Sequence, residues 1–77
     1  MSYRNATARQ VADEVRAALA RNRKRQRELG DLLGVSQQAA GRRLSGDQPF
    51  TVAEVSAVAD WLDVPVASFF PESREAS

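Results

Sequence analysis

The chain has 77 residues and contains neither cysteine nor histidine, which fits one domain with one small core and excludes disulfides, thiolate chemistry and the common zinc-ligand sets. No stretch approaches the roughly 20 apolar residues that span a bilayer, and the first residues lack a signal-peptide pattern, so we expect a soluble intracellular protein without a membrane partner. The net charge of +1 by itself favours no class of binding partner.

The first predicted helix begins after Thr7. Thr7 and Gln10 fit a capping box, in which the hydroxyl and the amide each bond a backbone N–H of the other residue. The apolar residues that follow recur at helical spacing and form one stripe: Val11, Val15, Ala18 and Leu19. The helix is predicted to end near Arg21 or Asn22.

A basic connection leads into two short helices. Residues 21–27 hold five cations and no apolar side chain, which indicates a solvated segment that enters the second helix at Gln26. That helix buries leucines at 29, 32 and 33, and Gly34 ends it because glycine accepts positive φ without a Cβ clash. Ser36 caps a third helix over 37–44, with Ala40 and Leu44 turned inward.

The second half of the chain begins with turn residues at 45–49. Thr51 and Glu54 form another capping box, and Phe50 with Val55 fits a hydrophobic staple. Apolar residues then predict a fourth helix that ends at 63–65, and Pro65 suits the first turn of a short fifth helix through Phe70. We predict a single domain over 1–77 with an ordered core at about 7–70 and flexible ends, folded as an all-α, compact five-helix bundle.

The two helices joined at 34–36 are too short to pack as a long hairpin. Helices of about eight residues with a three-residue connection cross steeply, which is the geometry of a helix-turn-helix. The crossing needs small residues where the backbones approach, and Gly30 and Ala40 stand at suitable positions. Glycine inside a helix costs about 1 kcal/mol relative to alanine, so contact geometry is expected to outweigh propensity at Gly30.

Charge is distributed unevenly along the chain. Residues 1–43 carry ten basic and four acidic residues, a net +6, whereas residues 44–77 carry one basic and six acidic residues, a net −5. If the fold keeps these halves on different faces, one face attracts a polyanion. The alternative is ordinary solubilising charge at two ends of the molecule.

The chain resembles the lambda-repressor-like (Cro-type) helix-turn-helix regulators of phages and bacteria over about residues 9–70. The matching segments are 26–30, 33–38 and 42–46, followed by the pattern Val55, Ala59, Leu62, Val64 and Phe70. The family usually has alanine at the position of Gly30 and a larger aliphatic residue at that of Ala40, so the two helices are expected to lie closer or to pack more loosely here.

The resemblance implies a DNA-binding function and a role for each position. Gln26 matches a glutamine that contacts a phosphate and braces the first glutamine of the recognition helix, which is Gln37. The positions that match base contacts in the major groove are Ser36, Gln37, Gln38, Gly41 and Arg42. Helix geometry supports the match, because it turns outward the residues Gln37, Gln38, Gly41, Arg42 and Ser45. A glutamine amide can pair with adenine and a guanidinium with guanine.

Gly41 is the least expected residue of this helix. A glycine exposed in mid-helix costs about 1 kcal/mol, which suggests either close approach of DNA to the backbone or simple tolerance. In the first case Gly41→Ala would stabilise the fold and weaken DNA binding.

Several cations flank the two short helices. The residues expected to contact the DNA backbone are Gln26, Arg23, Lys24, Arg25, Arg27, Arg43 and Ser45, with Arg4 and Arg9 as an amino-terminal arm. For any single cation, a solvated surface charge is the competing interpretation. As a group they predict binding that weakens steeply with salt.

The predicted function is therefore a sequence-specific, double-stranded-DNA-binding transcriptional regulator, a Cro-like repressor that associates with DNA in the cytoplasm of a bacterial host. The alternatives are an accessory DNA-binding protein, such as an antitoxin or excision factor, and a protein-interaction module. A docking helix would carry Leu, Phe or Tyr on its outer face. An enzyme is not expected, and neither is a cofactor, metal or small-molecule ligand.

Dimerisation is expected to use the carboxy-terminal part of the chain, either as a weak homodimer or as a dimer formed on DNA. Trp61, Val66 and Phe69 are candidates for a two-fold patch, and the alternative is that they close the edge of the small core. A dimer would bind a pseudo-palindromic operator with half-sites about one helical turn apart.

Overall fold

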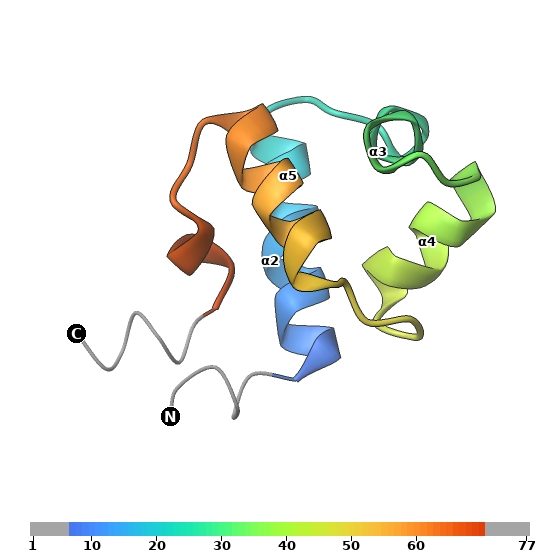
Figure 1. Cartoon of the computed structure of the whole chain (residues 1–77), viewed down its shortest axis with the longest axis horizontal. Coiled ribbons are helices and arrows are strands. Elements are labelled where there is room, and N and C mark those ends of the chain that lie inside the picture. The colour runs from blue at the N-terminus through green and yellow to red at the C-terminus, as the bar shows by residue number, and fades with distance from the viewer. Residues whose placement is uncertain (1–6, 71–77) are drawn as a thin grey trace.

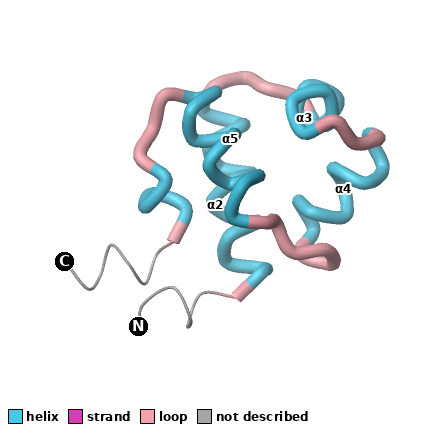
Figure 2. Tube along the Cα trace, in the orientation of Figure 1, coloured by secondary structure: helices cyan, strands magenta, loops and turns pink. Residues whose placement is uncertain are grey.

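The computed structural model describes residues 7–70, so the predicted flexible ends and the arm position Arg4 fall outside the described residues. The elements are α2 (Ala8–Arg21), α3 (Gln26–Leu33), α4 (Gln37–Ser45), α5 (Val52–Leu62) and the 3₁₀ helix η1 (Val66–Phe69). Residues 7–70 are all-helical and compact, with no strand among them (Figure 2). In Figure 1, α3 and α4 occupy one end of the molecule and η1 the other, with α2 and α5 between them.

Short-range caps fix where the longer helices begin. The Thr7 hydroxyl accepts from the Gln10 N–H at 3.0 Å, and the Gln10 side chain accepts from the Thr7 N–H at 2.8 Å. Thr51 and Glu54 repeat this arrangement at the start of α5, at 3.0 Å for both bonds. Both predicted capping boxes are confirmed, and each satisfies backbone donors that a helix start leaves without partners.

One apolar core joins the helices. The stripe predicted for α2 is buried, and so are the inward residues of α4 and α5. The largest side chains that are fully enclosed are Phe69, Leu29, Val15, Val55 and Val58. Leu32 and Leu33 are only partly buried against this core, so Leu29 is the main apolar anchor of α3.

The predicted fifth helix is a short 3₁₀ helix in the structure and not an α-helix. Residues Val66–Phe69 form a single 3₁₀ segment, and Pro65 precedes it as the N-cap residue. Phe70 lies outside the segment in an extended conformation. The described residues therefore contain four α-helices and one 3₁₀ turn, which packs against both α2 and α5.

Candidate nucleic-acid interface

The connection between α3 and α4 is a tight three-residue turn. Gly34 adopts φ 71° and ends α3 as predicted, and the Val35 N–H donates to the Gly30 carbonyl at 3.0 Å. The Ser36 hydroxyl then accepts from the Ala39 N–H at 3.0 Å and begins α4. Figure 1 shows α3 end-on while α4 lies across the view, so the two helices cross steeply.

Gly30 supplies the close approach that the crossing needs. It is buried, and a Cβ added there would lie 3.0 Å from the Val35 carbonyl oxygen and 3.4 Å from that of Ser36. The space is occupied by backbone, which cannot move as easily as a side chain. Contact geometry therefore outweighs helix propensity at this glycine, as predicted.

The outer face of α4 is polar and open. Ala40 and Leu44 are buried, as predicted, whereas Ser36, Gln37, Gln38, Arg42 and Ser45 are exposed. Within residues 7–70, the side chains of Gln37, Gln38 and Arg42 make no hydrogen bond or ion pair. The two serines differ from these three, because their hydroxyls serve the backbone: Ser36 caps α4, and Ser45 donates to the Arg42 carbonyl at 2.9 Å.

Gln26 bridges the starts of α3 and α4. Its Nε2 donates to the main-chain carbonyl oxygen of Gln37 at 2.9 Å. The resemblance implied that Gln26 braces Gln37, and in the structure Gln26 contacts the main chain of Gln37. The Gln26 side chain also covers Gly41, where an added Cβ would lie 2.8 Å from Nε2.

This packing corrects the interpretation of Gly41. The glycine is half-buried rather than exposed, and the group that approaches its backbone is the Gln26 amide. Contact with the Gln26 side chain is therefore one reason for glycine at this position, and contact of Gly41 with DNA stays a prediction. Gly41→Ala would gain about 1 kcal/mol of helix propensity, but the end of the Gln26 side chain would have to shift, so we expect a smaller net stabilisation than at an exposed position.

Arg43 was predicted to contact the DNA backbone, but it is held within the molecule. Its Nε donates to Glu54 Oε1 at 3.1 Å and its Nη1 to the Ala39 carbonyl at 3.1 Å. The two side chains are 15% and 17% exposed. Burial alone would raise the pKa of Glu54, but hydrogen bonds from Arg43 and Thr51 and the guanidinium charge outweigh burial and hold this pKa below its usual range.

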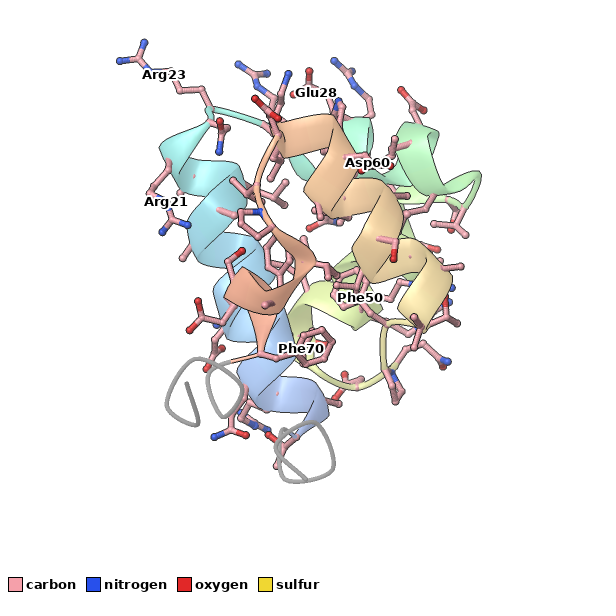
Figure 3. All side chains as sticks on the ribbon, turned by 60° about the vertical axis from the view of Figure 1, so that its left-hand side comes forward. Arg21, Arg23, Glu28, Phe50, Asp60 and Phe70 are labelled. Carbon is pink, nitrogen blue, oxygen red and sulfur yellow. The ribbon has the colours of Figure 1, made fainter. Side chains whose placement is uncertain are left out.

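The cations of the α2–α3 connection and of the first turn of α3 are mostly exposed. Arg23, Arg25 and Arg27 are exposed, and Figure 3 shows Arg23 extending into solvent from the connection. Lys24 is half-buried, with its Nζ 5.1 Å from the centroid of the Trp61 ring. Of the two predicted arm residues, Arg9 lies within the described part and is exposed.

The proposed dimer patch loses one of its three residues. Phe69 is 1% exposed and belongs to the core. For this residue the alternative holds, namely that it closes the small core. Trp61 is partly buried against the same core, while Val66 is 38% exposed. Only Val66 and part of Trp61 remain at the surface.

Two features were missed in the sequence. Arg16 Nη1 donates to the Leu44 carbonyl at the end of α4, and Nη2 pairs with Asp13. A shallow apolar pocket of about 250 Å³ also lies where α2 and α5 begin, and its lining includes Phe50 and Phe70, labelled in Figure 3. Nothing in the local sequence marks Arg16, because its partner is 28 residues away.

A family model for the BetR domain matches residues 2–77, nearly the whole chain. The chain belongs to the BetR domain family. No curated protein is similar enough to the chain to count as a match. In this BetR domain no helix within residues 7–70 is long and apolar enough to cross a membrane, and no cluster of potential metal ligands occurs among the same residues.

Proposed function

We propose that α3, the turn at 34–36 and α4 act as a helix-turn-helix, and that α4 binds in the major groove of duplex DNA. The protein would then be a sequence-specific transcriptional regulator of the Cro type, associated with DNA in the bacterial cytoplasm. The observation that carries this proposal is the outer face of α4, where three side chains able to read bases are exposed and unpaired: Gln37, Gln38 and Arg42.

The chemistry of this face suits base recognition. A glutamine amide offers a donor and an acceptor together, which matches adenine in the major groove, and a guanidinium matches the two acceptors of guanine. Exposed side chains of this kind can exchange water for base edges without breaking protein contacts. The inner face of α4 is buried and Ser36 caps its start, while the outer face stays exposed.

Phosphate contacts would come from the ends of the motif. Arg25 and Arg27 flank the start of α3, and Arg23 projects from the connection before it. These groups are exposed and therefore available to a polyanion, whereas Arg43 is engaged by Glu54. Phosphate contacts set the position of a protein on the duplex, and base contacts set the sequence.

The protein-interaction alternative has weaker support. The large hydrophobic side chains exposed in the described residues are Val52 and Val66, at 78% and 38%, and neither lies on α4. A docking helix would need apolar side chains at its centre. The pocket is lined mainly by apolar groups and offers no titratable side chain, so an enzymatic function gains no support from it.

Selection of binding sites from random duplex DNA tests the proposal. We expect a consensus sequence, and Arg42→Ala should lose about 1–3 kcal/mol of discrimination at one base pair of that consensus. Arg21→Ala is a matched control, because it removes the same charge from an exposed position at the end of α2, outside the two helices of the proposed motif. A wild-type protein that enriches no sequence would overturn the proposal.

A pseudo-palindromic consensus would indicate that the protein binds as a dimer, either preformed or assembled on DNA. The surface that remains for this contact is Val66 with the edge of Trp61. We expect Val66→Glu to weaken cooperative occupation of the two half-sites while leaving binding to one half-site intact. Sedimentation of the wild type and the variant, with and without DNA, measures both states.

A further inference from the structure

The amide of Gln26 packs against α4 between the Gln37 carbonyl and Gly41, a contact site that we call the seat. Nε2 is 2.9 Å from the Gln37 carbonyl oxygen, and the three atoms nearest to a Cβ added at Gly41 all belong to the Gln26 side chain. Among residues 7–70, the bond from Gln26 to Gln37 is the one side-chain hydrogen bond between α3 and α4. The seat therefore links the first turns of the two helices directly.

Helix geometry explains why the seat needs glycine at position 41. Residue 41 follows residue 37 by four positions, so a side chain at 41 lies on the same face as residue 37, and its Cβ is tilted toward the amino end of the helix. A Cβ there would approach Nε2 to 2.8 Å, closer than carbon and nitrogen pack. Any side chain at position 41 would therefore require the end of the Gln26 side chain, which carries the amide, to shift from its present position.

We propose that Gly41 is a positioning residue for DNA recognition, which acts through Gln26 rather than by touching DNA. Its missing Cβ keeps the amide on the Gln37 carbonyl and so fixes the first turn of α4, with Gln37 and Gln38, at one distance from α3. This inference rests on the proposed function. It assigns sequence discrimination to a residue that reads no base.

A double-mutant cycle over Gly41→Ala and Gln26→Ala tests the inference in the full-length chain. Affinity is measured for the selected site, for its single-base variants and for an unrelated duplex at one salt concentration. Thermal unfolding of the same four proteins is measured without DNA. The Gln26→Ala background is the matched control, because the added Cβ then meets no amide.

We expect Gly41→Ala to weaken binding to the selected site about tenfold and to flatten discrimination at the base pairs under the first turn of α4. Binding to unrelated DNA should stay within about twofold of the wild type, since the substitution leaves the exposed Arg23, Arg25 and Arg27 in place. In the Gln26→Ala background, Gly41→Ala should not weaken binding further. There it should raise the Tm by about 4–8 °C, because helix propensity is then unopposed.

The same loss of discrimination with and without Gln26 would overturn the inference and leave the proposed function standing. Coupling in the Tm alone, with additive effects on DNA, would also overturn it, because the seat would then be structural only. A wild-type protein that selects no DNA site would instead overturn the proposed function, and the inference with it.

Discussion

Gly34 and Gly46 end α3 and α4 with the same left-handed backbone, at φ 71° and 88°, but their surroundings differ. A Cβ at Gly34 would meet nothing within 4 Å, whereas a Cβ at Gly46 would lie 3.1 Å from the Arg9 Cα. The first glycine is needed for its conformation alone. The second is needed for conformation and for space, because the backbone of α2 passes beside it.

We therefore expect Gly34→Ala to lower the free energy of unfolding by about 1–2 kcal/mol, the penalty of the left-handed conformation, and Gly46→Ala to lower it further. Chemical denaturation of the three proteins measures the difference. Gly34→Asn is the control, because asparagine tolerates this conformation and should cost less than alanine. Equal losses at the two glycines would mean that the neighbouring backbone moves away freely.

Residue-scale features were predictable where both partners lie within a few positions. Thr7 with Gln10 and Thr51 with Glu54 were identified correctly because a capping box is a pattern of four consecutive residues. The seat of Gln26 beside Gly41 could not be identified in this way, since its partners are 15 positions apart. Glycine is unusual in the middle of a helix, but which residue lies beside Gly41 depends on how α3 crosses α4.

At the scale of elements, the end of α4 is tied to α2 by Arg16. Its guanidinium donates to the Leu44 carbonyl, one of the last carbonyls of α4, which have no partner within the helix. A cation at this end also interacts favourably with the helix dipole. One side chain thus connects the first helix of the described chain with the helix proposed to enter the groove.

We expect Arg16→Gln to lower the free energy of unfolding by about 1 kcal/mol, a value reduced from that of a buried charged bond because the side chain is half exposed. Arg21→Gln, at an exposed position of the same helix, should change stability little. Thermal unfolding at low and high salt measures both variants. A loss no greater than that of Arg21→Gln would show that water replaces the Leu44 contact without cost.

The contact between Arg43 and Glu54 joins α4 to α5 and makes stability depend on pH. The pKa of Glu54 is lowered on folding from its ordinary value of 4.5. The unfolded chain therefore binds a proton before the folded one as pH falls. The stabilisation is complete above pH 4.5 and is lost as pH falls through the lower pKa of the folded state.

We expect acid to destabilise the wild type more than Glu54→Gln, which has no carboxyl to protonate. Asp60→Asn is the control, since Asp60 is exposed on the same helix. Urea unfolding at neutral pH and below 4.5 gives the comparison. An unchanged acid sensitivity in Glu54→Gln would assign the pH dependence to other carboxyl groups.

The elements themselves were largely predictable, and the exceptions have physical reasons. The bounds of α3 and α4 follow from Gly34 and Ser36, which act locally. The fifth helix was predicted from Pro65 and two phenylalanines, but only four residues remain helical before Phe70 becomes extended. Phe69 in this segment is buried in the core, a packing contact that the local sequence does not reveal.

On the scale of the whole molecule, the uneven charge of the chain matters through the cations that are not already paired within the protein. Arg43 and Arg16 are used to hold helices together, whereas Arg23, Arg25 and Arg27 are exposed. The sequence alone could not separate these groups, because pairing depends on packing between distant segments. Fewer basic groups are therefore free at the surface of the folded chain than its composition suggests.

We expect binding to the selected site to weaken steeply with salt, with a log–log slope of about 0.9 per phosphate contacted. Replacing Arg23, Arg25 or Arg27 by glutamine should reduce the slope by about that amount for each residue that contacts a phosphate. Arg43→Gln should leave the slope unchanged and lower stability instead. If none of the three replacements changes the salt slope, the phosphate contacts lie elsewhere on the protein.

The position of Lys24 over the ring of Trp61 also provides an optical signal. Trp61 is the single tryptophan of the chain, so its fluorescence reports on one place, the junction of the basic connection with α5. An ammonium above an indole alters its emission, and a phosphate that draws Lys24 away would change that emission again. Titration of the unlabelled protein with duplex DNA should therefore change the tryptophan fluorescence. Lys24→Met should remove this change while leaving the tryptophan in place.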